Sequence, residues 1–434
     1  MAELKGALPD PQHQIATRRT LRDVAWNLPA LAITKGRGIV LLILLTRVVG
    51  IEQYGVWVQA NVVANLVGMC AGLGLYQALI QFHPEAIDPK DRAELVWTVL
   101  GSVLVAGLIL GIILLLARTI ISKVLTGTDQ WSSAFAWAGA LGGAYAVRLL
   151  LFSYFRAQDR IRAFSTLGVF GDLVDIVLVL TAAFAWRSTT ATIVASTIGA
   201  ALIAVGVGAY VVGKVGPPRF SGRRLVSALR YSLPIVPTQL GDEALARGDR
   251  LLVGALLGPI PTGVYSAAYT LIGIPHIVNV ALINVLFPKM TTRRWGIEAT
   301  RTLWKRSTLS FLAFSLVVLG ILVPTAKSVL TLMIGPRGGV VQITWIVLAI
   351  GAGVMLFDLG RLLSLDLYVR RDTMRIALIW GASAALNLAL NLVLLPLIGL
   401  LGAALATLIA YFVFAAWIFV VVRSSPATLP HPHV

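Results

Sequence analysis

The sequence has little charge and almost no cysteine. Of its 434 residues, 13% are charged and one, Cys70, is a cysteine. A single thiol forms neither an internal disulfide nor a thiolate metal cluster, and the five histidines show no metal-ligand spacing. These shortages argue against redox and zinc chemistry, and we expect no cofactor apart from a coupling Na⁺ or H⁺.

The chain also lacks a leader-like beginning. Its first 25 residues are polar, include Arg18, Arg19 and Arg22, and contain no apolar core or small-residue cleavage site, so we expect no cleaved signal peptide.

The formal net charge of +17 would suggest a nucleic-acid partner if the protein were soluble. In a membrane protein, basic loops report orientation instead, and we expect no nucleic-acid partner.

What the sequence has in abundance is apolar residues, at 58% of the chain. A helix that crosses a bilayer takes about 20 apolar residues, and runs such as 103–117 contain no charge. The pattern predicts an all-α, polytopic integral membrane protein with twelve transmembrane helices. The predicted spans are 27–49, 56–80, 95–117, 132–155, 164–186, 190–213, 231–257, 264–288, 307–324, 340–368, 376–395 and 399–422.

The distribution of Lys and Arg predicts the orientation of these helices. With an even number of spans, both termini lie on one side, and that side carries 24 of the 36 basic residues against five on the other. The positive-inside rule therefore places both termini in the cytoplasm. The richest segments, 214–230 and 289–306, could also attract anionic lipid head groups.

A weak internal repeat divides the chain into two halves. The pattern G-x-x-x-x-G-V-aromatic begins at Gly50 and again at Gly258, an offset of 208 residues or six spans. Because six is even, the repeat is parallel and predicts two six-helix lobes related by a pseudo-twofold axis along the membrane normal. The predicted divisions are an N-terminal cytoplasmic tail (1–26), the first lobe (27–213), a basic cytoplasmic linker (214–230), the second lobe (231–422) and a cytoplasmic tail (423–434).

Fourteen charged residues fall inside the spans, where each costs about 2.5–3.5 kcal/mol at mid-depth. The first lobe has a surplus of basic residues and the second a surplus of acidic ones. Lys35 and Arg37 have no acidic residue within a helical turn, so we expect them to line a watery cavity or bind an anion. Arg148 is a second candidate, whereas Arg47 is close enough to the outer surface to reach it.

The acidic residues inside the spans allow several interpretations. Asp172 and Asp175 share a helix face and could bind a coupling cation, pair with the arginines of their lobe, or both. Glu243 and Arg247 have ion-pair spacing, so a purely structural network that includes Arg250 is an equal alternative in the seventh span. The candidates for ion coupling are Asp172, Asp175, Asp242, Glu243, Asp249 and Asp358.

Proline and glycine inside the spans can kink helices and permit rocking. In the tenth span, Asp358 is one turn from Arg361 and is also open to a structural interpretation. We interpret His276, next to Pro275, as a packed helix residue rather than a proton relay.

Three segments together resemble a known family. They are 45–57 (LTRVVGIEQYGVW), 263–269 (GVYSAAY) and 387–407, which contains NLALN and GLLGAALAT. Their order and spacing are similar to those of bacterial polysaccharide flippases of the O-antigen transporter type, in the multidrug/oligosaccharidyl-lipid/polysaccharide exporter superfamily. Lipid II flippases of this superfamily have two further C-terminal helices, which favours an O-antigen or exopolysaccharide repeat unit here.

The resemblance implies a monomeric transporter, not an enzyme, in the bacterial cytoplasmic membrane. It would move a polyprenyl-diphosphate-linked oligosaccharide between leaflets by alternating access, among membrane lipids and beside a polysaccharide polymerase and chain-length machinery. The candidate residues for the diphosphate and the cavity are Lys35, Arg37, Arg148, Arg47, Arg247 and Arg250. A cation-coupled multidrug antiporter of the same fold is the alternative, and a membrane-embedded glycosyl transferase or polymerase is a third class.

Overall fold

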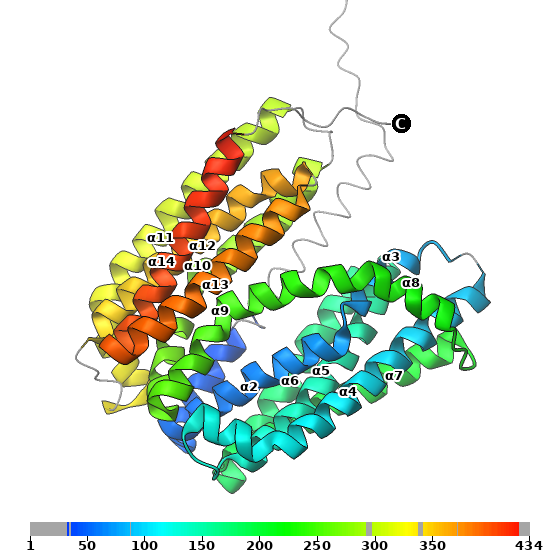
Figure 1. Ribbon diagram of the computed structural model, residues 1–434, viewed down its shortest axis with the longest axis horizontal. Coiled ribbons are helices and arrows are strands. Elements are labelled where there is room, and N and C mark those ends of the chain that lie inside the picture. The colour runs from blue at the N-terminus through cyan, green and yellow to red at the C-terminus, as the bar shows by residue number, and fades with distance from the viewer. Residues whose placement is uncertain are drawn as a thin grey trace, which may run out of the picture.

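The computed structural model describes residues 33, 36–86, 88–291, 297–336, 342–370 and 372–424. Regular structure in these ranges is helical, and after a first helix at 36–48 the chain forms two bundles, α2–α8 and α9–α14 (Figure 1). The elements are α2 (Ile51–Gly72), α3 (Leu75–Phe82), α4 (Pro89–Thr126), α5 (Ser132–Ala157), α6 (Ile161–Trp186), α7 (Thr189–Val215), α8 (Gly222–Ser232), η1 (Leu233–Ile235), α9 (Val236–Leu257), α10 (Pro259–Thr291), α11 (Ile297–Ile334), α12 (Ile343–Val369), α13 (Thr373–Ile398) and α14 (Leu400–Ser424).

The helices are those of a multi-pass membrane protein, as predicted. In the described ranges, 10 helices are long and apolar enough to cross a bilayer: α2, α4–α7 and α10–α14. The predicted span 27–49 lies partly outside these ranges. The predicted span 231–257 corresponds to α9, whose charged residues keep it from being an apolar span by composition. Twelve spans therefore remain a prediction.

The predicted span 56–80 is not one helix. It is divided into α2 and α3 at Leu73 and Gly74, which both adopt left-handed backbone angles, with φ of 47° and 66°. A side chain at position 74 would put its Cβ 2.9 Å from the backbone oxygen of Ser232. The chain turns here because α3 packs closely against the end of α8, a contact that the hydropathy pattern does not reveal.

The predicted basic linker 214–230 is also partly helical, because it contains most of α8. The Ser221 hydroxyl accepts a hydrogen bond from the backbone N–H of Arg224 and caps this helix. Ala228 is buried and Leu229 half-buried against the first bundle, while Arg223 is exposed. From α8 the chain passes through η1 into α9, which leads to the second bundle (Figure 1).

The two copies of the sequence repeat contact each other where α2 and α10 begin. A Cβ added at Gly55 would lie 1.9 Å from the Pro259 oxygen, and one added at Gly263 would lie 2.6 Å from the Ile51 oxygen. These two contacts are equivalent under the repeat, since 51 matches 259 and 55 matches 263. We call these four residues the glycine seam; there the helix backbones approach so closely that only glycine fits.

Other contacts join the bundles at the same end. The Gln59 side-chain amide donates to the Thr262 hydroxyl at 3.2 Å. The first helix donates hydrogen bonds to the end of α11, from the Thr46 hydroxyl to the Met333 carbonyl and from the Arg47 guanidinium to the Leu332 carbonyl. The bundles are thus held together at the end that the distribution of basic residues predicts to be outside.

We predict that Gly55→Val opens the glycine seam. Overpacking costs about 1–3 kcal/mol, which changes the population of a closed state by about fivefold to about a hundredfold. The measurement is the rate of maleimide labelling at Thr262→Cys in a Cys70→Ser background, which we expect to rise about tenfold. The control is Gly101→Val in α4, where an added Cβ meets nothing within 4 Å; equal labelling in the two variants would contradict the prediction.

Candidate functional site

A polar cavity of about 240 Å³ lies between the bundles. Its walls come from the C-terminal half of α2, from α3 and α5, and from the N-terminal half of α9. The glycine seam is at the N-terminal end of α2, so the cavity lies toward the opposite end of that helix. The lining residues are Asn65, Gly68, Met69, Gly72, Gly74, Tyr76, Tyr145, Ala146, Leu149, Gln239 and Asp242. The Gln239 amide of α9 donates to the Tyr76 hydroxyl of α3 at 2.8 Å, which links the two bundles across the cavity.

Arg37 lies beside this cavity, but its charge is already paired. Its guanidinium is 3.3 Å from the Asp172 carboxylate and 2.5 Å from that of Asp175, both on α6. The Asp172 and Asp175 residues are buried, and the side chain of Tyr145 also interacts with Arg37. One cation between two carboxylates leaves the group with net negative charge, so Arg37 fastens the first helix to α6. Sequence spacing did not reveal the partners of Arg37, because both carboxylates are on another helix.

Arg148, on α5, has no carboxylate within salt-bridge distance among the described residues, and it contacts Tyr145, which lines the cavity. Its guanidinium lies over the rings of Tyr145 at 5.2 Å and Phe152 at 5.8 Å. Cation–π contacts hold a guanidinium in place and leave its charge and hydrogen-bond donors available. Arg148 is half-buried, and its neighbour Leu149 lines the cavity. Arg148 therefore lies next to the cavity wall, with a charge that no described carboxylate neutralises.

The other two cations predicted for the first lobe do not join this group. Lys35 lies outside the described residues. Arg47 is exposed and donates to the Leu332 carbonyl at 3.1 Å, next to the glycine seam and away from the cavity. Of the four predicted cations, the structure brings Arg37 and Arg148 together, with Tyr145 between them.

In α9 most of the predicted charges have partners within the second bundle. Arg247 is 2.5 Å from Glu243, the ion pair that the spacing allowed. The buried Asp249 accepts hydrogen bonds from the Tyr265 hydroxyl at 2.9 Å and from the backbone N–H of Arg250 at 2.8 Å. The Arg250 guanidinium lies 4.5 Å from the centre of the Tyr269 ring. Asp242 differs from these residues because it lines the cavity.

Asp358, on α12, is fully buried, and its carboxylate is 2.8 Å from Nδ1 of His276 on α10. The interpretation of His276 as a packed helix residue missed this partner. Tyr145 and Gln239 were also missed, since a single polar residue in an apolar span gives no periodic signal. Among the described residues, no group of three or more His, Cys, Asp and Glu side chains is arranged to hold a metal ion.

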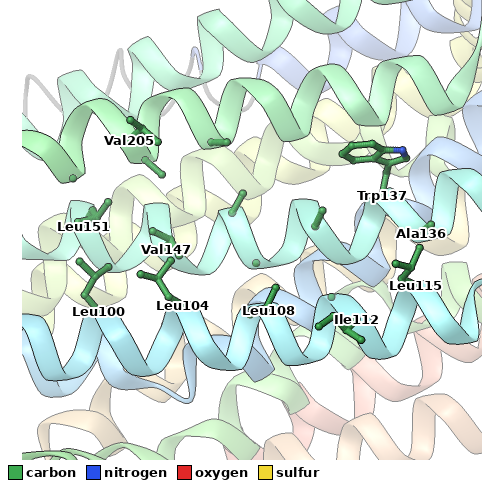
Figure 2. A pocket seen from close by; sticks show the side chains of 18 residues that line it. Leu100, Leu104, Leu108, Ile112, Leu115, Ala136, Trp137, Val147, Leu151 and Val205 are labelled. Carbon is green, nitrogen blue, oxygen red and sulfur yellow. The ribbon is translucent and has the colours of Figure 1, made fainter. Parts of the chain in front are cut away.

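A larger groove of about 740 Å³ lies between α4, α5 and α7 (Figure 2). Its walls are apolar, with Leu104 and Leu108 on α4, Trp137 and Val147 on α5, and Val205 on α7. These helices are candidate membrane spans, so hydrocarbon chains surround the groove. A groove without charged side chains cannot bind a polar head group, and the candidate site is the smaller cavity between the bundles.

Comparisons with known proteins agree with this architecture. The family model described as "Polysaccharide biosynthesis protein" matches residues 20–293. The succinoglycan biosynthesis transport protein ExoT of Rhizobium meliloti (strain 1021) is 23% identical over 281 residues, which are 63% of this chain and 54% of ExoT. The chain thus matches about half the length of that relative.

Solved structures show the same fold at low sequence identity. The lipid II flippase MurJ, in an inward closed conformation, matches with a TM-score of 0.77 and 12% identity, over 94% of this chain and 88% of MurJ. An inward-facing multidrug resistance MATE family transporter of the MOP superfamily matches with a TM-score of 0.62 and 14% identity, over 91% of this chain and 94% of that one.

We predict that the double substitution Asp172→Asn and Asp175→Asn destabilises the protein strongly, because it leaves the half-buried Arg37 guanidinium without a counter-charge. Removing the partners of a buried ion costs about 3–5 kcal/mol. Thermal unfolding in detergent micelles measures this as a lower Tm. Asp129→Asn is the matched control, since Asp129 pairs with Lys123 at 3.4 Å on the exposed surface; equal Tm values for the two variants would exclude this role for Arg37.

Proposed function

The chain belongs to the polysaccharide biosynthesis protein family, and from that premise we propose that it is a flippase for a polyprenyl-diphosphate-linked oligosaccharide. The comparisons show the family, and the structure shows a multi-pass membrane protein with the fold of MurJ and of MATE transporters; that the chain is a transporter in polysaccharide biosynthesis and not an enzyme is the first part of the proposal. The proposal adds the cargo, an O-antigen or exopolysaccharide repeat unit. It also adds the direction, from the inner to the outer leaflet of the bacterial cytoplasmic membrane.

The observation that carries the proposal is the position of Arg148, which lies against Tyr145 in the wall of the cavity between the bundles. A diphosphate cannot cross hydrocarbon without compensating charge, and a guanidinium offers paired donors to phosphate oxygens. Arg148 has aromatic neighbours and no carboxylate partner among the described residues. In this proposal Arg148 binds the diphosphate, Lys35 assists it, and Arg37 positions the first helix through α6.

The proposal includes alternating access between two lobes, 27–213 and 231–422, about a pseudo-twofold axis. The glycine seam closes one end, which the distribution of Lys and Arg assigns to the outside, with both termini in the cytoplasm. The cavity then receives its cargo from the cytoplasmic side. Opening the seam and closing the cavity releases the cargo outward, and carboxylates of the second lobe couple this cycle to Na⁺ or H⁺.

One observation favours the alternative, a cation-coupled multidrug antiporter. Asp242 is the charged residue among those that line the cavity, and an organic cation would bind to its carboxylate. The two functions make opposite demands on these residues, because a diphosphate needs Arg148 and an organic cation needs Asp242.

We predict that Arg148→Ala reduces surface polysaccharide at least tenfold at normal protein level, and that Arg148→Lys retains part of it. The lysine keeps the charge but loses the paired donors. The measurement is surface polysaccharide in a deletion strain that expresses each variant. Arg118→Ala, at an exposed position of α4, is the matched control. Full export by Arg148→Ala would contradict the proposal, and loss of resistance to a cationic drug in an Asp242→Asn variant with full polysaccharide export would favour the antiporter.

We also predict that deletion of the protein makes lipid-linked oligosaccharide accumulate in the cytoplasmic leaflet, because chain assembly continues while translocation stops. The measurement is the fraction of labelled lipid-linked oligosaccharide that an external glycan-modifying enzyme reaches in intact spheroplasts. Lys35→Ala should give the same accumulation. Normal outward transfer in the deletion strain would overturn the proposed cargo.

A further inference from the structure

His276 and Asp358 form a polar pair inside the second bundle. His276 Nδ1 on α10 is 2.8 Å from Asp358 Oδ1 on α12, and the side chains are 25% and 0% exposed. Asn279, one turn beyond His276, donates from its side-chain amide to the backbone oxygen of Asp358 at 2.8 Å. The pair therefore connects a fully buried carboxylate to a partly exposed imidazole.

The pair is not saturated with hydrogen bonds. Asp358 Oδ2 and Asn279 Oδ1 are both buried, and neither meets a donor among the described residues. A buried carboxylate oxygen without a partner is costly, because the free energy of its lost hydration is not replaced. These two free acceptor oxygens would be stabilised by one more positive charge next to the pair.

The charges around the pair lead to the same conclusion. Asp242 is in electrostatic range of His276 and connects the pair with the cavity that it lines. The charged groups that interact with Asp242 are Glu243 and Arg247 on α9, Arg361 on α12 and His276 when it is protonated, and Tyr411 on α14 interacts with Asp358. Asp242, its three charged neighbours other than His276, and Asp358 together contain three carboxylates and two guanidinium groups, a net charge of −1 while His276 is neutral. Within the described ranges, the hydrogen bonds and ion pairs of the His276 and Asp358 side chains join them to each other and to no titratable side chain of α2, α11 or α13.

We propose that the pair of His276 and Asp358 is the proton site that drives the conformational cycle; the inference rests on the proposed function and names its coupling ion. A proton from water in the cavity binds Nε2 of His276, while Nδ1–H donates to Asp358 Oδ1. The cluster then becomes neutral. When the proton returns to water, the imidazole is neutral again and the net charge of −1 is restored.

The position of His276 on α10 explains how a proton bound there acts at a distance. The same helix carries Gly263 of the glycine seam near its beginning and His276 thirteen residues later. Pro275 lacks a backbone N–H, so α10 is weakened beside the pair and can change direction there. A change in the attraction between α10 and α12 therefore alters the angle at which α10 meets α2.

The test measures conformation without any cargo, so its result does not depend on the identity of the substrate. Spin labels on Arg47→Cys and Leu332→Cys in a Cys70→Ser background report the distance across the outer end, where Arg47 contacts the exposed Leu332. Double electron–electron resonance in nanodiscs is recorded at about pH 5.5 and about pH 8, on either side of the ordinary imidazole pKa of about 6.5. We expect the ratio of short to long distances to change about tenfold between these conditions, as one proton per molecule allows.

The variants identify the groups responsible. In His276→Gln and in Asp358→Asn we expect the distance distribution to be the same at both pH values. His83→Gln is the matched control, because His83 is also buried but lies at the end of α3 beside the Tyr154 ring; this variant should keep the response. Monodispersity and Tm show whether each variant is folded, and His276→Gln keeps the test decisive if Asp358→Asn does not fold.

Two outcomes would overturn the proposal. One is a pH response that persists in both variants of the pair. The other is a response to Na⁺ at constant pH with no response to pH, which would make Na⁺ the coupling ion. If deletion of the protein leaves lipid-linked oligosaccharide transfer unchanged while this pH response is present, the cargo is wrong and the proton site stands.

Discussion

The cost of placing charge in hydrocarbon governs the interior of this protein. Each intramembrane ion must find a partner or a wet surface, and most of those described here find a partner. Arg37 is held by two carboxylates, Arg247 by Glu243, and Asp249 by the Tyr265 hydroxyl. These pairs hold helices in register within or between the bundles. Few of the described groups remain without a counter-charge, among them Asp242, which lines the cavity, and Arg148, which lies against its wall at Tyr145, and these are the candidates for a function.

The apolar spans could be predicted from sequence because lipid imposes its requirement on one helix at a time. A run of about 20 apolar residues suffices for that prediction, whatever the helix packs against. The breaks at Leu73 and Gly74 and the helix α8 could not be predicted so easily. The first depends on the approach of Ser232 from a distant segment, and the second depends on the surface that Ala228 covers.

The candidate site was only partly predictable for a similar reason. The sequence identified Arg37 and Asp175 as charged residues inside predicted membrane spans. They are on different helices, and Asp172 is 135 positions away from Arg37, so no spacing along one helix pairs them. Pair spacing along one helix therefore made Arg37 look like a free cation. In α9 the same rule succeeded, because Glu243 and Arg247 are four residues apart. Sequence patterns locate the charges, and only the packing of helices decides which of them neutralise one another.

The equivalent contacts of the glycine seam also describe an interface with twofold symmetry. In such an interface a residue at position i of one copy meets position j of the other, and position j of the first meets position i of the second. Ile51 with Gly263 and Gly55 with Pro259 follow this rule. A six-helix chain with one copy of the motif could therefore have closed the same contact as a homodimer. The two contacts of the seam are the ones that such a homodimer would make across its axis.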